Sequence, residues 1–132
     1  RLGLTSAVEE MLAEVSESSE INFEYEIDSI DGVFSPANEI NFYRVVQESV
    51  NNILKHSDAT KAKVFVRRKV DKIELLVQDN GKGFAIQEKN IHGKSGFGLF
   101  GIEERVRILG GRLSIKSEKG KGTKVIVVIE KI

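Results

Sequence analysis

Four polar side chains recur along one face of a predicted helix and are the first candidates for chemistry. Glu48, Asn52 and Lys55 follow one another at helical spacing, and Arg44 precedes Glu48 by one turn. At about 100° of rotation per residue the four share one side of the helix, whereas His56 lies off this stripe. A carboxylate and a carboxamide oxygen one turn apart suit Mg²⁺, which takes one or two protein oxygens and completes its shell with phosphate and water. A solvated helix face with i,i+4 hydrogen bonding explains the same stripe more simply, so the helix does not identify a site by itself.

The segment Asp79-Asn80-Gly81-Lys82-Gly83-Phe84 follows a predicted strand. Asn-Gly is a strong hairpin signal, and a plain turn is therefore one interpretation. No strand begins after Phe84, however, which weakens it. An aspartate at a strand end, followed by two spaced glycines, lets a ligand lie against bare backbone.

A second glycine segment, Gly96-Phe97-Gly98-Leu99-Phe100-Gly101, runs directly into a predicted helix. Backbone N–H groups at a helix start are free to bind an anion, and the helix dipole favours negative charge there. Alone this is weak evidence for a phosphate site, and the segment is not the dinucleotide fingerprint because no strand immediately precedes it. Gly122-Thr123, at the start of the last predicted strand, is typical of a hairpin exit.

The periodicity of apolar residues predicts the helices and strands that position these motifs. The long helix should begin with Ser35 as N-cap and Pro36 at its first position, and present Phe42, Val46, Val50 and Ile53 on its apolar back. A capping box of Ser6 and Glu9 is expected in the first helix. The expected order is helix Leu4–Val15, strand Ile21–Ile27, helix from Pro36 to about His56, strands Lys61–Arg68 and Lys72–Gln78, loop Gly81–Gly98, helix Leu99–Leu109, and strands Arg112–Lys116 and Thr123–Ile129.

Hairpins flanked by helices predict an α/β (α+β) two-layer sandwich, in which a mixed, mostly antiparallel sheet carries helices on one face. A length of 132 residues is that of one domain, expected to span 1–132. The chain contains no cysteine, which excludes disulfides and thiolate chemistry. It begins at Arg1, shows no signal-peptide pattern and has no long apolar run, so we expect an excised, cytoplasmic piece of a longer protein.

The formal net charge is zero, which argues against a general nucleic-acid binder. The balance hides a split, because residues 1–60 hold 12 acidic and 3 basic side chains, whereas residues 61–132 hold 8 and 17. Ten of the 12 glycines also lie between Gly81 and Gly122. The second half therefore combines backbone freedom with positive charge, as binding of an anion requires.

Taken together, these segments resemble the ATPase superfamily shared by gyrase, the ninety-kilodalton heat-shock chaperone, histidine kinases and the mismatch-repair ATPase. The run 48–56 resembles its N box, 79–84 its first glycine box, 96–101 its second, and Gly122-Thr123 its closing pair. Order and spacing agree over Phe34–Ile132. The resemblance implies a Bergerat-type ATP-binding fold.

Sensor histidine kinases of a short-lid group, which includes nitrate- and thermosensing kinases, are the nearest likeness. The signs are the N box with Lys55-His56 and the run Gly98–Arg105. Only 11 residues separate Phe84 from Gly96, and no phenylalanine-centred box lies between them, unlike the longer-lidded majority. Residues 84–101 would form the ATP lid, and residues 1–4 the tail of a linker from a missing dimerisation domain.

The resemblance implies roles for individual residues. Asn52 would hold Mg²⁺, Glu48 would act catalytically by orienting a Mg²⁺-bound water or polarising the attack, and Lys55 would contact phosphate. Asp79 would accept the adenine amino group, with Thr123 supporting Asp79 through its hydroxyl or a water. The remaining residues implied in nucleotide binding are His56, Gly81, Gly83, Phe84, Gly96, Phe97, Gly98, Leu99 and Gly101.

The function expected from this likeness is binding of Mg·ATP and donation of its γ-phosphoryl group to a histidine on a separate dimerisation domain, in two-component signalling. The isolated domain should be monomeric and should not phosphorylate itself. The full-length protein would be a homodimer, membrane-anchored, with a response regulator as partner. Alternatives are a serine kinase of the anti-sigma type, a chaperone- or topoisomerase-like ATPase that uses Glu48 for hydrolysis, and a non-catalytic module that keeps the fold.

Overall fold

The computed structural model describes residues 3–84 and 99–130. In these ranges the elements are α1 (Leu4–Ser18), β1 (Asn22–Ile27), α2 (Pro36–Asn52), the π-helical turn η1 (Ile53–Ser57), β2 (Lys61–Arg68), β3 (Lys72–Asp79), α4 (Leu99–Ile108), β4 (Gly111–Glu118) and β5 (Gly122–Glu130). The five strands form one sheet in the order β1-β2-β3-β5-β4. β1 and β2 pair in parallel, and every other neighbouring pair is antiparallel.

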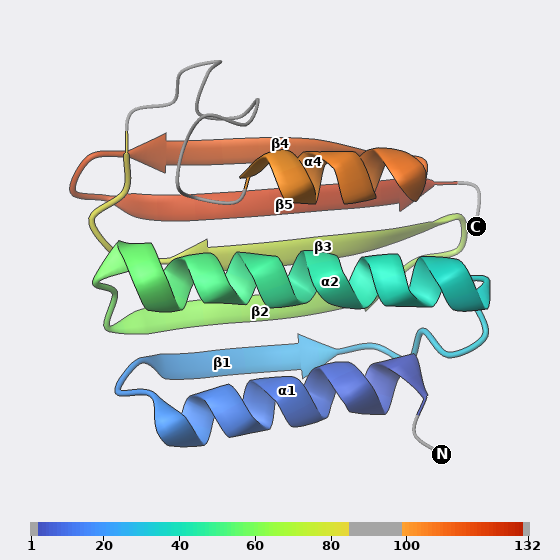
Figure 1. Ribbon diagram of the computed structural model, residues 1–132, viewed down its shortest axis with the longest axis horizontal. Helices are drawn as coiled ribbons and strands as arrows, with labels where there is room; N and C mark the ends of the chain where they lie inside the picture. The colour runs from blue at the N-terminus through green and yellow to red at the C-terminus, as the bar shows by residue number, and fades with distance from the viewer. Residues whose placement is uncertain (1–2, 85–98, 131–132) are drawn as a thin grey trace.

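The described helices all lie on one face of this sheet (Figure 1). α1 lies over the β1 edge, α2 crosses the middle of the sheet, and α4 lies over β4 and β5. The predicted two-layer sandwich with a mostly antiparallel sheet is therefore confirmed. The strand order was not predicted, because hairpin signals do not reveal that β5 inserts between β3 and β4.

Alternation along the strands builds the core between the two layers. Ala62, Val64 and Val66 of β2 are buried, and β3 and β5 repeat the same period. The predicted apolar back of the long helix is confirmed, with the side chains of Phe42, Val46, Val50 and Ile53 at most 3% exposed. Val45 and Ser49 are also buried, so the buried stripe is wider than the wheel suggested.

Helix starts follow two different mechanisms. Ser35 caps α2 as predicted, since its Oγ accepts from the backbone N–H of Asn38 at 3.3 Å, with Pro36 at the first position. The capping box predicted for α1 is wrong: the N-cap position is Gly3, and no local side chain caps the helix. Instead Asp31 accepts from the backbone N–H of Thr5 at 2.9 Å, so a residue distant in sequence takes the capping role.

The predicted continuation of the long helix to about His56 is confirmed, but its last turn is a π-helix. In a π turn the hydrogen bond spans five residues rather than four, so successive side chains advance through a smaller angle. The turn ends at Asp58, which has a left-handed backbone with φ of 53°. This irregular turn lies beside the pocket described next and contributes Ile53, His56 and Ser57 to its wall.

Candidate nucleotide-binding site

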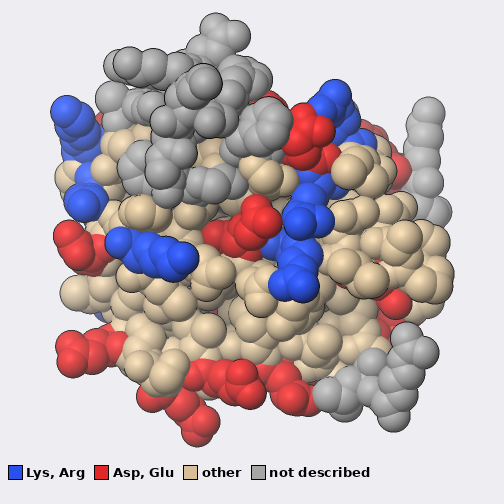
Figure 2. All heavy atoms as spheres, viewed as in Figure 1, with Lys and Arg blue, Asp and Glu red and all other residues tan. Residues whose placement is uncertain are grey.

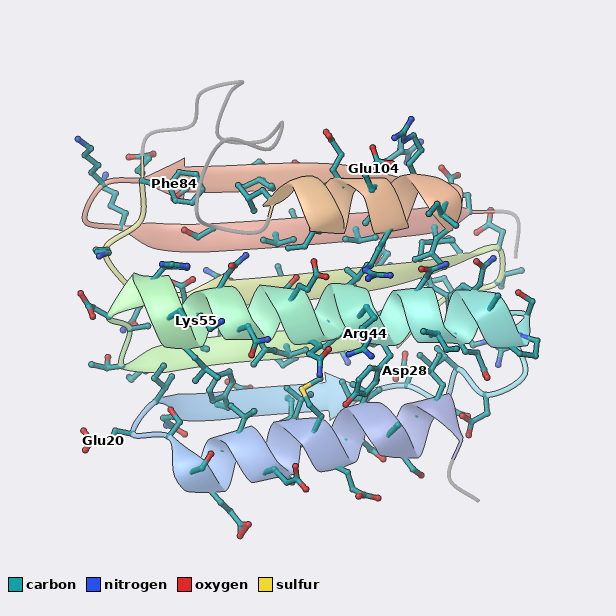
Figure 3. All side chains as sticks on the ribbon, viewed as in Figure 1. Glu20, Asp28, Arg44, Lys55, Phe84 and Glu104 are labelled. Carbon is teal, nitrogen blue, oxygen red and sulfur yellow. The ribbon has the colours of Figure 1, made fainter. Side chains whose placement is uncertain are left out.

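A pocket with a cavity volume of about 40 Å³ lies between the C-terminal end of the long helix, the end of β3, the start of β5 and the start of α4. In Figure 3, Phe84 and Lys55 mark this end of the molecule. The pocket wall is mainly apolar, with a few polar groups, as is common for small-molecule sites. Its lining residues are Ser49, Asn52, Ile53, His56, Ser57, Val77, Asp79, Gly83, Phe84, Leu99, Thr123 and Val125.

Asp79, the last residue of β3, places a carboxylate in this wall. It pairs with Ala62 on one side and Thr123 on the other, and it is only 8% exposed. Burial raises the pKa of Asp79, while the backbone N–H groups of Gly81 and Thr123 act in the opposite direction. The N–H of Gly81 donates to its Oδ1 at 2.8 Å. The sequence-predicted acceptor is therefore a buried, hydrogen-bonded carboxylate inside a largely apolar pocket.

Two glycines of the first box permit close approaches of the backbone. A Cβ on Gly81 would lie 2.1 Å from the carbonyl oxygen of Ser57, and one on Gly83 would lie 2.0 Å from that of Glu118. Gly83 also has φ of +60°, which favours glycine. Gly83 lines the pocket, whereas Gly81 lies outside the lining and packs against η1. The backbone N–H of Lys82 donates to the same Ser57 oxygen at 2.7 Å, which ties the loop to the helix end.

Ser117 of β4 contacts two residues of the pocket wall, and sequence reasoning missed it. Its Oγ accepts from the backbone N–H of Phe84 at 2.9 Å and lies 2.8 Å from Oγ1 of Thr123. The Thr123 hydroxyl thus contacts Ser117, and the backbone of Thr123 is what hydrogen-bonds Asp79. The strand pairing that brings Ser117 opposite Thr123 is not visible from spacing alone.

The polar stripe of the long helix reaches the pocket only in part. Asn52 lines it, and so does His56, which the wheel had placed off the stripe. Lys55 does not line the pocket, and it is exposed. With Glu48 at 0° and about 100° per residue, His56 falls at about 80°, between Asn52 at about 40° and Ser49 at about 100°, and all three line the pocket. The pocket therefore faces the flank of the polar stripe and not its centre, where Lys55 lies.

Glu48 lies outside the pocket lining and contacts α4 instead. Its Oε1 lies 3.3 Å from Nε of Arg105, and a Cβ on Gly101 would lie 2.9 Å from its Oε2. Arg105 belongs to the run Gly98–Arg105 that carried the resemblance, yet the sequence suggested no role for its side chain. The contact between α2 and α4 was not predictable, because it depends on tertiary packing.

Among the residues of the second glycine box, Leu99 and Gly101 lie in α4, where Leu99 lines the pocket. Gly96, Phe97 and Gly98 lie outside the described residues, as does the greater part of the expected lid. In residues 3–84 and 99–130 no helix is long and apolar enough to span a membrane. The same ranges contain no group of three or more His, Cys, Asp or Glu side chains that could hold a metal ion.

A family model described as "Histidine kinase-, DNA gyrase B-, and HSP90-like ATPase" matches residues 37–131. The chain belongs to this family. The match begins in the first turn of α2 and extends past the end of β5, so it covers every element that lines the pocket. The predicted superfamily resemblance is confirmed.

Curated relatives of this ATPase-family domain are sensor histidine kinases. The chain is 36% identical over 129 residues to the sensor histidine kinase ComP of Bacillus subtilis, covering 98% of this chain and 17% of ComP. It is 34% identical over 127 residues to the sensor histidine kinase LiaS of the same organism, covering 96% of this chain and 34% of LiaS. The chain therefore spans only about a sixth to a third of these relatives.

Solved structures show the same fold at low sequence identity. The histidine kinase domain of the blue-light activated kinase EL346 from Erythrobacter litoralis superposes with a TM-score of 0.82 at 18% identity, over 98% of this chain and 62% of that one. The mycobacterial sensor histidine kinase MprB gives a TM-score of 0.72 at 22% identity, over 98% and 95%. These similarities establish the fold of the domain.

The raised pKa of Asp79 predicts an effect on stability. The pKa of Asp79 is higher in the folded state than the ordinary value of 3.8, so ionising Asp79 disfavours folding. The stability that comes from keeping this carboxyl protonated is present below the unfolded pKa and is lost as pH rises through the folded pKa. We expect Asp79→Asn to gain free energy of unfolding relative to wild type at pH 7. That gain should shrink as the pH falls toward 4, in urea titrations at several pH values. A difference independent of pH would contradict the assignment of this burial cost to Asp79.

Proposed function

We propose that this domain binds Mg·ATP and donates the γ-phosphoryl group to a histidine on a separate dimerisation domain, as part of two-component signal transduction. The observation that carries the proposal is the buried Asp79 carboxylate in an apolar-walled pocket beside the start of a helix. The similarity to sensor histidine kinases supports the same class of activity, transfer of a phosphoryl group to histidine.

The adenine end of the proposed site is the wall around Asp79. Ile53, Val77 and Val125 supply apolar surface for a planar base. The carboxylate accepts a hydrogen bond from the six-amino group of adenine, whereas guanine presents a carbonyl oxygen there. An unpaired buried acceptor costs about 1–3 kcal/mol or more when charged, so the site should prefer adenine.

The phosphate end is proposed at the start of α4, where Leu99 meets the pocket. The first backbone N–H groups of a helix lack intrahelical partners, and the helix dipole attracts anions. By resemblance, Gly96, Phe97, Gly98 and Gly101 would complete this cradle. Lys55 is exposed at the end of the long helix, from which its long side chain would reach an outlying phosphate.

The residues present fit Mg²⁺ carried by the nucleotide better than a metal held by protein alone. Asn52, whose side chain carries a carboxamide oxygen, lines the pocket, and Glu48 lies one helical turn before it. Mg²⁺ keeps several water and phosphate ligands, so one or two protein oxygens suffice. When bound, the ion neutralises phosphate charge that develops during transfer.

The work of the chain's own residues would be positioning and charge compensation. Asp79 would fix the base, Asn52 and the α4 backbone would orient the polyphosphate, and Glu48 would orient a water or polarise the attack. The histidine that attacks would come from the dimerisation domain. In this proposal the domain faces the cytoplasm as part of a membrane-anchored homodimer, and residues 1–4 are the tail of the linker from the dimerisation domain. A response regulator receives the phosphoryl group.

Nucleotide specificity tests the adenine assignment. Calorimetry should show that the wild-type chain binds ATP and prefers it clearly over GTP. Asp79→Asn should lose about tenfold or more in ATP affinity, because the variant amide is a weaker acceptor than a buried carboxylate. Lys124→Gln, on the neighbouring strand outside this pocket, is the matched control and should bind ATP normally. Unchanged ATP affinity in Asp79→Asn would remove Asp79 from the site.

The magnesium assignment is tested at Asn52. Asn52→Ala should bind ATP similarly with and without Mg²⁺, because it lacks the carboxamide oxygen that couples the ion to the helix, whereas the wild type should bind more tightly with Mg²⁺. Asn51→Ala removes the same group at the preceding, exposed position and should keep the wild-type Mg²⁺ dependence. A normal Mg²⁺ titration in Asn52→Ala would refute the ligand assignment.

Phosphoryl transfer should need a second domain. The chain holds only two histidines, His56 and His92. His56 lines the proposed nucleotide pocket, and His92 lies outside the described residues. With labelled ATP the lone chain should stay unlabelled, whereas addition of the dimerisation domain of the same protein should give acid-labile label on that domain. Stoichiometric label on the lone chain would overturn the proposal.

A further inference from the structure

Arg105 joins α4 to α2 through two side chains. Its Nη1 donates to Oδ1 of Asn41 at 3.1 Å, and its Nε donates to Oε1 of Glu48 at 3.3 Å. Asn41 and Glu48 lie two turns apart on the same face of α2, so a forked guanidinium can reach both. The paired side chains of Arg105 and Glu48 are 34% and 31% exposed, so this is a partly desolvated contact rather than a surface ion pair.

The other oxygen of Glu48 lies against the backbone of α4. A Cβ on Gly101 would approach Oε2 to 2.9 Å, closer than real Cβ atoms come. Gly101 and Arg105 are one helical turn apart, so the carboxylate lies between bare backbone at one position and a guanidinium at the next. The first turn of a helix also carries partial positive charge, which holds the carboxylate in the same place.

This carboxylate lies next to the proposed phosphate end of the pocket. Glu48 precedes Asn52 by one turn, and Gly101 follows Leu99 by two residues, and both Asn52 and Leu99 line the pocket. An uncompensated carboxylate there would repel the phosphates of ATP. A compensated and fixed carboxylate leaves the phosphates free to use the N–H groups of α4.

We propose, on the basis of the Mg·ATP site proposed above, that Arg105 is a positioning residue that acts through Glu48. Its guanidinium holds the carboxylate against Gly101 and cancels its charge, so that polyphosphate can approach the start of α4. Loss of Arg105 leaves Glu48 free to turn toward the pocket and repel the ligand. Asn41 fixes the guanidinium from its far side.

A double-mutant cycle separates this role from simple helix packing. ATP binding without Mg²⁺ is measured by calorimetry in the wild type, Arg105→Gln, Glu48→Gln and the double variant. We expect Arg105→Gln to weaken binding about tenfold, Glu48→Gln to strengthen it, and the double variant to lie within about threefold of wild type, a coupling typical of residues in direct contact. The expected rescue follows because no charge remains at position 48 for Arg105 to compensate.

Arg107→Gln is the matched control. It removes the same charge from α4, but Arg107 pairs with Glu104 on the exposed side of the helix. Its effect on ATP binding should stay below about twofold, because exposed charges are screened by salt. An equal loss in Arg107→Gln and Arg105→Gln would show a general field effect and overturn the proposal.

Additive effects of the two substitutions would also overturn the proposal. Arg105→Gln would then weaken binding as much in the Glu48→Gln background as in the wild-type background, so Arg105 would not act through Glu48. If Arg105→Gln shows no cooperative thermal unfolding and is therefore not folded, Arg105→Lys replaces it in the cycle. The lysine keeps the charge but cannot span Asn41 and Glu48, and we expect a loss of about threefold that disappears with Glu48→Gln. If the folded wild-type chain binds no ATP, the proposed function itself fails, whereas an additive cycle in a chain that binds ATP rejects only the role of Arg105.

Discussion

The buried carboxylate of Asp79 is the constraint on which the rest of the site depends. A carboxylate that is 8% exposed loses hydration, and backbone N–H groups from two directions offset part of this loss, although burial still raises its pKa. One comes from Gly81, in the loop that follows β3, and the other from Thr123 on β5. Supplying both requires β3 to lie beside β5 and the loop to turn back at once. The sheet order and the glycine loop are thus two parts of one electrostatic arrangement.

Close approaches of the backbone make that arrangement possible. Gly81 contacts η1, Gly83 contacts the end of β4, and a Cβ on Gly122 would lie 2.1 Å from the carbonyl oxygen of Asp79. Gly83 and Gly122 also have positive φ. Three segments distant in sequence therefore meet around one carboxylate, and a side chain at any of the three positions would separate them. The clustering of glycine in the second half of the chain has this packing cause as well as any role in binding ligand.

Sequence reasoning succeeded where local pattern determines structure. Strand alternation, the Ser35-Pro36 helix start and the apolar back of α2 were confirmed, because each depends on neighbours within one or two turns. It failed where tertiary contact decides. Asp31 caps α1 from a distance, the pocket is lined by His56 and not by Lys55, and Arg105 reaches Glu48 across 57 positions of sequence. The roles implied for individual residues stay predictions, although Asn52, Asp79 and Thr123 do meet at one pocket.

Charges of opposite sign also lie apart on the face that carries the helices, although the basic side chains over the long helix, Arg44 and Lys55, come from the acidic half of the sequence (Figure 2, Figure 3). Acidic side chains gather along the α1 edge, whereas basic ones lie over α2 and toward α4 (Figure 2). Because α1 covers β1 and α4 covers β4 and β5, the acidic surface lies at the opposite edge of the sheet from the proposed phosphate site. Salt screens exposed charges over about 8 Å at physiological ionic strength, and strands lie about 4.8 Å apart. The β1 and β4 edges, with three strands between them, are therefore separated by more than this screening length. The acidic edge therefore does little to repel ATP. In the proposed site the charges nearest the phosphates are those of Glu48, Arg105, Lys55 and the α4 N-terminus, so compensation of one carboxylate should matter more to binding than the net charge of the domain.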